Sequence, residues 1–162
     1  MLATAKQNPE PFAYKVRVRA CGLLIEKQQV LLIKHKGIGK AGFLWSPPGG
    51  GVEFGQSLEK TLKREFLEET NLSIQIVKFL FTNEHIDGKH HALEFFFAVI
   101  RKSGVLQLGS DPELDQSSQI LEEARFFGES DLKNIPQNAI HSAFRRGQNI
   151  MDLRGLLTFE SE

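Results

Sequence analysis

The sequence contains little cysteine, no excess of either charge and no long hydrophobic run, and each of these absences excludes a class of protein. Cys21 is the only cysteine among 162 residues, which excludes an internal disulfide and a cysteine-rich zinc site. It lies in an apolar run, so we expect a small buried side chain rather than a nucleophile. Lysine plus arginine and aspartate plus glutamate each number 20, so net charge favours neither nucleic acid nor an anionic membrane as a partner.

The chain also lacks the segments that direct proteins into or across membranes. No apolar stretch approaches the ~18 residues of a transmembrane helix, and the polar first ten residues lack the hydrophobic core of a signal peptide. We therefore expect a cytoplasmic protein. The composition, with 41% hydrophobic residues and 13 phenylalanines, predicts one folded domain over residues 1–162. Residues 1–11 are expected to form a flexible tail.

Periodicity predicts a mixture of strands and helices. Alternation from Tyr14 to Ile25, a polar turn over residues 26–29 and the apolar run 30–33 are typical of a β-hairpin. Residues 46–55 are too rich in glycine and proline for a regular element. The other predicted elements are strands at 73–84, 92–102, 123–127 and 153–159, helices at 58–70 and 137–146, and a helical turn at 130–131. These elements indicate an α+β fold.

The helix over residues 58–70 carries three glutamates on or beside its apolar face. The apolar stripe consists of Leu58, Leu62, Phe66 and Leu72. Glu65 and Glu69 lie within this stripe and Glu68 at its border, whereas Arg64 falls on the opposite side. Glutamates of a helix usually form a solvated, salt-bridged face, but carboxylates that face a core cost several kcal/mol unless they are compensated. Because Mg²⁺ and Mn²⁺ prefer carboxylate oxygens, a divalent cation would relieve both burial and mutual repulsion.

Three consecutive glycines precede this helix. Gly49, Gly50 and Gly51 allow the backbone to approach a ligand closely, with carbonyls for a metal or amides for a phosphate. Three glycines can also form an ordinary turn. A glycine loop that leads to a helix N-terminus can accept an anion, and next to an acidic cluster it indicates metal-assisted phosphate chemistry.

Residues 50–72 form a long pattern of fixed spacing. Gly50 is followed after five residues by Gln56 and, after seven more, by Arg-Glu-Phe-Leu-Glu-Glu-Thr-Asn-Leu from Arg64 to Leu72. This pattern resembles the signature of the Nudix hydrolase family: Gly, five residues, Glu, seven residues, Arg-Glu-apolar-any-Glu-Glu-any-Gly-apolar. Gln56 and Asn71 depart from it by replacing Glu and Gly. Asn71 is expected to serve as a left-handed C-cap with little harm.

The resemblance implies a fold, an activity and a set of site residues. The fold is an α/β/α sandwich with a mixed central sheet. The activity is hydrolysis of a nucleoside diphosphate linked to another moiety, by attack of water on phosphorus with Mg²⁺ or Mn²⁺. Glu65, Glu68 and Glu69, with a carbonyl of the turn at Gly50, would hold the metal, and Arg64 would orient the acids. The resemblance is also compatible with a homodimer.

Several other residues are weaker candidates. Arg17 and Arg19 project from one side of the first strand, where they either contact phosphate together with the glycine loop or form a solvated face. A glutamate that many family members carry ahead of the late strand is absent here. Its nearest substitutes, expected to be solvated loop charges, are Asp111, Glu113, Asp115 and Glu122. The histidines, expected at ordinary surface or hairpin positions, are His35, His85, His90, His91 and His141.

Two functions remain open at this point. The first is the hydrolase, acting on a small-molecule nucleotide. The second is a Nudix-like sensor that binds nucleotide without turnover, which Gln56 and the missing acid favour. Subgroup marks after the signature are absent, so the nucleotide derivative stays open.

Overall fold

The structure is a computed structural model that describes residues 12–112 and 114–145. The predictions for residues 1–11, for Glu113 and for a strand at 153–159 lie outside these residues. The elements are, in chain order, β1 (Lys15–Glu26), β2 (Gln29–Lys36), β3 (Phe43–Ser46), β4 (Gly49–Gly51), α1 (Leu58–Thr70), β5 (Ser73–Asp87), β6 (His90–Ser103), the 3-10 helix η1 (Gln116–Ser118), β7 (Leu121–Phe127), α2 (Glu129–Lys133), the 3-10 helix η2 (Gln137–Ala139) and α3 (Ser142–Arg145).

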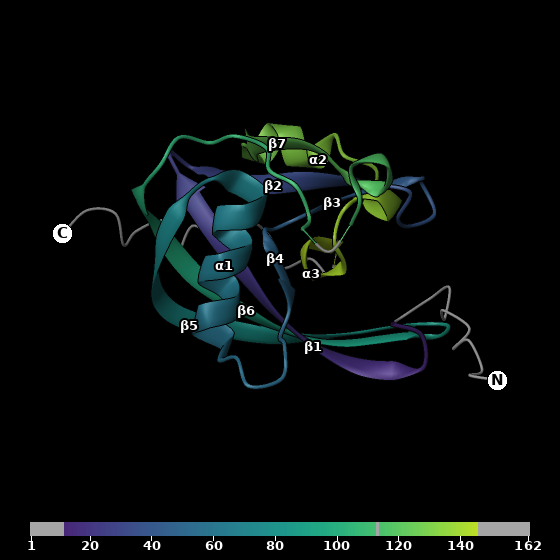
Figure 1. Ribbon diagram of the computed structural model, residues 1–162. Coiled ribbons are helices and arrows are strands. Elements are labelled where there is room, and N and C mark those ends of the chain that lie inside the picture. The colour runs from purple at the N-terminus through teal and green to yellow at the C-terminus, as the bar shows by residue number, and fades with distance from the viewer. Residues whose placement is uncertain (1–11, 113, 146–162) are drawn as a thin grey trace.

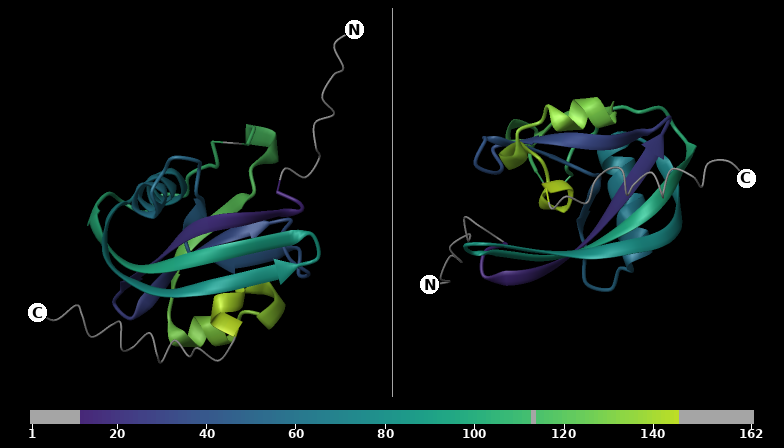
Figure 2. Two further views of the ribbon diagram at one scale, coloured as in Figure 1. Left: turned by 90° about the horizontal axis from the view of Figure 1, so that it is seen from below. Right: turned by 180° about the vertical axis from the view of Figure 1, so that it is seen from behind.

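The strands of the described residues form one mixed sheet of seven strands. Its order is β3-β2-β1-β6-β5, with β4 paired to β1 and β7 paired to β2. β1 and β6 run parallel, whereas β1–β2 and β5–β6 are antiparallel. Helix α1 lies on one side of the strands, and α2 and α3 lie on the other (Figures 1 and 2). This arrangement confirms the predicted α/β/α sandwich.

The predicted hairpin is present, with its turn at the predicted residues. β1 and β2 are joined by Lys27 and Gln28, whose φ angles are 49° and 61°. Two successive residues with positive φ are typical of the tight turns whose twist matches that of paired strands. The turn aligns β2 against β1, with Ile25 opposite Val30.

The central strand β1 buries side chains on both of its faces, and this places α1. Ala20 and Leu24 pack with Leu62 and Phe66 of the helix on one side. On the other side Cys21, only 3% exposed as the sequence predicts, joins a second apolar cluster. A Cβ atom at Gly22 would lie 2.5 Å from the ring of Phe66, so glycine allows the helix to approach this closely.

Three predictions differ from the structure, and in two of them tertiary contacts override local propensity. The glycine-rich residues 49–51 form the strand β4, which pairs with β1 from Arg19 to Cys21. The helix predicted at 137–146 is interrupted, because Ile140 is extended and bridges to Trp45. In its place are η2 and α3, up to Arg145, the last described residue. The strand predicted at 123–127 begins two residues earlier.

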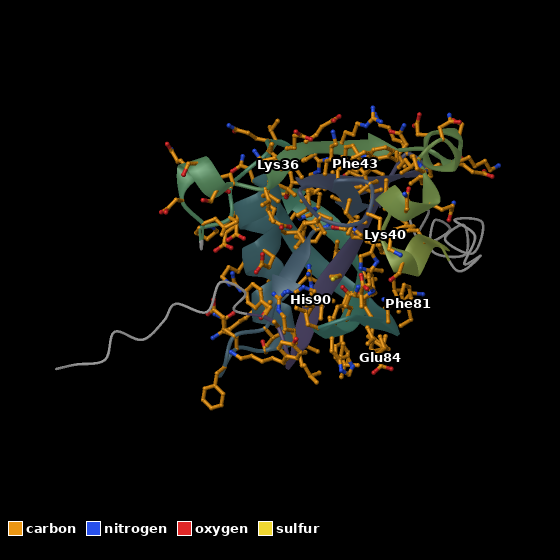
Figure 3. The ribbon with its side chains drawn as sticks, turned by 90° about the vertical axis from the view of Figure 1, so that its right-hand side faces the viewer. Lys36, Lys40, Phe43, Phe81, Glu84 and His90 are labelled. Carbon is orange, nitrogen blue, oxygen red and sulfur yellow. The ribbon has the colours of Figure 1, made fainter. Side chains whose placement is uncertain are left out.

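The two halves of the sheet separate at one end of the molecule. Seen from that side, Lys36, Lys40 and Phe43 of the β2–β3 region lie above Phe81 and Glu84 of β5 (Figure 3). Across residues 12–112 and 114–145, none of the helices combines the length and hydrophobicity needed to cross a membrane.

Asn71 ends α1 in the left-handed conformation, with φ 59° and its N–H bonded to the carbonyl of Leu67. We expect Asn71→Ala to lower the free energy of unfolding by about 1–2 kcal/mol, because alanine tolerates this conformation poorly. Asn71→Gly should cost much less, although it removes the side-chain bond to the carbonyl of Val105. Urea unfolding measures both variants, and equal losses for alanine and glycine would contradict this account.

Candidate functional site

Helix α1 holds its acids beside the core because its ends and its apolar face are both well defined. Ser57 caps the N-terminus by accepting a hydrogen bond of 3.1 Å from the amide of Lys60. Leu62 and Phe66 are fully buried, and Glu69 on the same face is 7% exposed. The helical projection therefore predicted correctly that a carboxylate would face inward.

Glu69 is fixed by the glycine strand. Its Oε2 atom accepts a hydrogen bond of 3.0 Å from the amide of Gly49. Burial is the main cause that raises the pKa of Glu69 to about 8, and the negative charge of Glu65 adds to it. The bond from Gly49 and the charge of Arg19 act in the opposite direction without cancelling this effect.

Arg64 connects the other two glutamates. Its Nη1 atom lies 3.0 Å from a carboxylate oxygen of Glu65 and 3.0 Å from one of Glu68. Burial nevertheless raises the pKa of Glu65. The helical projection places Arg64 on the side opposite the apolar stripe, yet its side chain is 25% exposed and reaches both carboxylates. The length and flexibility of arginine allow this, which a projection of Cα positions does not capture.

At two positions of β4 there is no room for a side chain, so only glycine fits. A Cβ atom at Gly49 would lie 2.3 Å from the carbonyl oxygen of Ala20, because β4 approaches β1 closely there. A Cβ atom at Gly50 would lie 2.3 Å from the carboxylate of Glu65. The glycines therefore let the backbone lie directly against the acids.

The donors at this site fit a divalent cation. They are carboxylate oxygens that are partly desolvated and that repel each other, and both effects are relieved by a positive ion. Within the described part of the chain, no three histidine, cysteine or acidic side chains already converge as a metal cluster. Arg64 contacts one oxygen of Glu65 and one oxygen of Glu68, which leaves the second oxygen of each carboxylate for an ion.

Both arginines of the first strand are half-buried. The guanidinium of Arg19 donates through Nη2 to the carbonyl of Gly49 at 3.3 Å and lies 3.7 Å from Glu94. Arg17 lies over the ring of Phe12 at 3.8 Å, and a Cβ atom at the third glycine of β4 would be 3.0 Å from it. Both arginines thus lie beside the glycine strand.

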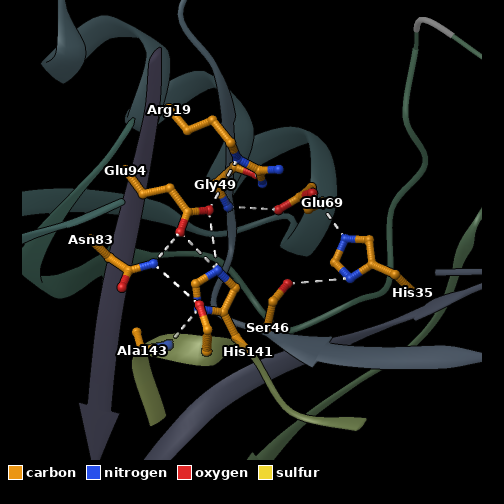
Figure 4. Close-up of polar contacts among 10 residues, drawn as sticks. Arg19, His35, Ser46, Gly49, Glu69, Asn83, Glu94, His141 and Ala143 are labelled. Carbon is orange, nitrogen blue, oxygen red and sulfur yellow. Dashed lines mark hydrogen bonds and ion pairs between the residues drawn. The ribbon is translucent and has the colours of Figure 1, made fainter. Parts of the chain in front are cut away.

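A buried polar cluster that was not predicted lies next to Arg19. Glu94, 3% exposed, contacts His141 at 3.0 Å and Asn83 at 2.9 Å (Figure 4). The available signal was a glutamate inside the phenylalanine-rich run of β6. His141 could not be found from sequence, because its position depends on the interruption of the predicted helix. Its assignment to an ordinary surface position is therefore wrong.

His35 lies on β2 of the hairpin, with a side chain that is 11% exposed. Its Nδ1 atom lies 3.3 Å from the hydroxyl of Ser46, and its Nε2 atom lies 3.9 Å from Glu69. Burial lowers the pKa of His35 to about 4, and the charge of Arg19 contributes. The imidazole is therefore neutral near pH 7.

The remaining acidic candidates are separated by the structure. The negative charge of Asp111 raises the pKa of both Glu65 and Glu69, which indicates that it lies near them. Gln119 holds the backbone of Asp111 by two hydrogen bonds, of 2.7 and 2.8 Å. Glu122 instead pairs with Lys34 at 2.7 Å. Asp115 is exposed beside η1.

Several known proteins are similar to this chain in sequence. The sequence profile of the NUDIX domain matches residues 13–146. An ADP-ribose pyrophosphatase of Methanocaldococcus jannaschii is 31% identical over 120 residues, which cover 73% of this chain and 63% of that protein. A putative 8-oxo-dGTP diphosphatase of Bacillus subtilis is 48% identical over 48 residues, 30% of each protein. This chain therefore spans less than two thirds of the length of either curated relative.

A solved structure extends the likeness to the whole fold. The crystal structure of a MutT NUDIX hydrolase from Burkholderia pseudomallei is similar with a TM-score of 0.66 and 26% sequence identity. The match covers 81% of this chain and 94% of that one.

Gln56 is used in a way that glutamate could not reproduce. Its amide nitrogen donates to the carboxylate of Glu53 at 2.8 Å, and its oxygen accepts from Thr61 at 3.3 Å. We expect Gln56→Glu to lower the free energy of unfolding by about 0.5 kcal/mol at pH 7, because two carboxylates would then be adjacent. Chemical denaturation of metal-free protein measures this loss. Adding Glu53→Gln to this variant should restore the free energy of unfolding. If Gln56→Glu alone is as stable as wild type, the assigned role of Gln56 is wrong.

The pKa of Glu69 makes metal-free stability depend on pH. Because the folded pKa of about 8 lies above the ordinary value of 4.5, the contribution of Glu69 is complete below pH 4.5 and is lost as pH rises towards 8. Glu69→Gln should therefore match wild type near pH 4 and exceed it at pH 8, by on the order of 2 kcal/mol. Thermal unfolding with a chelator tests this. Glu59→Gln, on the exposed side of α1, should show no such gain.

Proposed function

This chain belongs to the NUDIX domain family, and on that premise we propose that it hydrolyses the phosphoric anhydride bond of a nucleoside diphosphate linked to another moiety. The reaction would use Mg²⁺ or Mn²⁺ and attack of water on phosphorus. One observation carries the proposal: the carboxylates of α1 are desolvated directly beneath the glycine strand. Such an arrangement is costly for stability alone and is explained by cation and phosphate chemistry.

The residues that would hold the ion are Glu65, Glu68 and Glu69, with the carbonyl of Gly50. When bound, such an ion would act as a Lewis acid towards a phosphoryl oxygen and the attacking water. Arg64 would orient Glu65 and Glu68, which it already contacts on α1. The role of the protein is to fix these oxygens before substrate arrives.

Other residues would act on the substrate itself. Arg19 and Arg17 place positive charge beside the glycine strand, which suits the phosphates of a nucleotide. Gly49 and Gly51 let those phosphates approach the backbone. We assign to a carboxylate oxygen of Glu65 the removal of the proton from the attacking water, since this carboxylate lies directly against the glycine strand. Asp111 would add charge near the same carboxylates.

The proposed substrate class is supported by the relatives and by side chains at one end of the molecule. ADP-ribose and 8-oxo-dGTP, named for the two curated relatives, are both nucleoside polyphosphate derivatives. Phe43 and Phe81, with Lys36 and Lys40, lie at that end of the molecule (Figure 3). Aromatic rings suit a base, and lysines suit its phosphates.

A substrate panel tests the proposal. Nucleoside triphosphates, nucleotide sugars, ADP-ribose and dinucleoside polyphosphates are incubated with Mg²⁺ or Mn²⁺, and phosphate-containing products are measured. We expect turnover of at least one compound, and we expect Glu68→Gln to reduce kcat by about a hundredfold or more, because one oxygen ligand is weakened. Glu59→Gln is the matched control on the same helix and should stay within about twofold of wild type.

Turnover that survives unchanged in Glu68→Gln would contradict the assigned role of the acids. Absence of turnover in wild type, combined with tight binding of one unhydrolysed nucleotide, would overturn the hydrolase and favour a nucleotide sensor.

A further inference from the structure

The sheet places three polar side chains of different strands in one row. Glu94 of β6 is the direct partner of Arg19 in the parallel pairing with β1. It is also the direct partner of Asn83 in the antiparallel pairing with β5. Directly opposed residues project from the same face of a sheet, so these side chains are neighbours by register. Arg19 in turn lies opposite Gly51 of β4, which brings the row to the glycine strand.

Glu94 is a buried carboxylate whose charge is maintained. Burial alone would raise its pKa, but the hydrogen bond from His141, the charge of Arg19 and the hydrogen bond from Asn83 lower the pKa of Glu94 to about 2. It is therefore ionised at any pH near neutrality. Burying an ionised carboxylate is costly, so its position at this point of the sheet needs a reason.

His141 is oriented to support Glu94. Its Nδ1 atom accepts a hydrogen bond of 3.2 Å from the amide of Ala143, so the hydrogen is on Nε2. Nε2 lies 3.1 and 3.0 Å from the two oxygens of Glu94. Asn83 donates to Glu94 at 2.9 Å and also contacts Ser142 at 3.3 Å. The segment that leads into α3 thus fixes the carboxylate from the side opposite Arg19 (Figure 4).

Arg19 connects Glu94 to the glycine strand. Burial alone would lower the pKa of its guanidinium, but the surrounding acidic groups, Cys21 and Glu94 first, raise it overall. Its Nε atom is buried without a hydrogen bond and lies 3.7 Å from Glu94, so the carboxylate holds it by charge. Its Nη2 atom donates to the carbonyl of Gly49, whose own amide donates to Glu69.

We propose that Glu94 is a positioning residue that holds Arg19 against the carbonyl of Gly49 and thereby fixes the glycine strand over the glutamates of α1. His141 and Asn83 keep Glu94 in place. The substrate never contacts Glu94, which acts through Arg19. This inference rests on the proposed function only for its effect on turnover, because the positioning itself is a property of the free protein.

The first measurement is hydrogen exchange of the Gly49 amide in the metal-free protein, followed by NMR. We expect Glu94→Gln to increase this rate by about tenfold, because Arg19 loses its charged partner and the turn opens more often. Exchange of the Leu24 amide, in the buried centre of β1, should not change. A purely structural role for Glu94 would instead accelerate both amides together.

A matched control lies on the same two strands. Glu26 of β1 and Arg101 of β6 form an ion pair with contacts of 2.6 and 2.8 Å, distant from the glycine strand. Glu26→Gln removes a carboxylate from an arginine in the same way. It should leave both the exchange of Gly49 and the turnover of substrate unchanged.

A double-variant cycle tests whether Glu94 acts through Arg19. Glu94→Gln and Arg19→Ala should each accelerate exchange at Gly49 and lower kcat/KM by about tenfold, whereas the double variant should be no worse than Arg19→Ala. Independent, multiplying effects would overturn the proposal, as would an unchanged rate at Gly49 in Glu94→Gln. If exchange responds as expected but wild type hydrolyses none of the tested compounds, the proposed function fails while the positioning role stands.

Discussion

The site depends on the backbone of Gly49, which is held by both of its polar groups. Its amide donates to Glu69 of α1, and its carbonyl accepts from Arg19 of β1. Glycine is required because a Cβ atom there would overlap the backbone of β1. One residue thus connects the helix that carries the acids, the central strand and the glycine strand, and its position sets the distance between backbone and carboxylates.

The two buried glutamates on either side of Gly49, Glu69 and Glu94, have pKa values shifted in opposite directions. Burial and the neighbouring Glu65 raise the pKa of Glu69 to about 8, because only one hydrogen bond and a shared arginine oppose them. The pKa of Glu94 is about 2, because His141, Arg19 and Asn83 all stabilise its charge. A destabilised carboxylate suits a group that is to receive a cation, whereas a satisfied one suits a fixed support.

The departures from the family signature have physical explanations in the structure. Asn71 adopts the left-handed conformation that glycine would supply, so α1 ends where the sequence predicts. Gln56 connects Glu53 to Thr61 rather than to the acids of α1. Asp111, one of four candidates left open by the sequence, is the acid whose charge affects Glu65 and Glu69.

Local signals were enough to predict the β1–β2 hairpin, the limits of α1 and the inward orientation of Glu69. These features follow from hydrophobic period and helix capping within a few residues. Three other features came from long-range packing: the strand character of Gly49–Gly51, the path of the Arg64 side chain over the acids and the meeting of Arg19, Glu94 and His141. Those features depend on strand register and on side-chain paths between segments far apart in the chain, which no local pattern encodes.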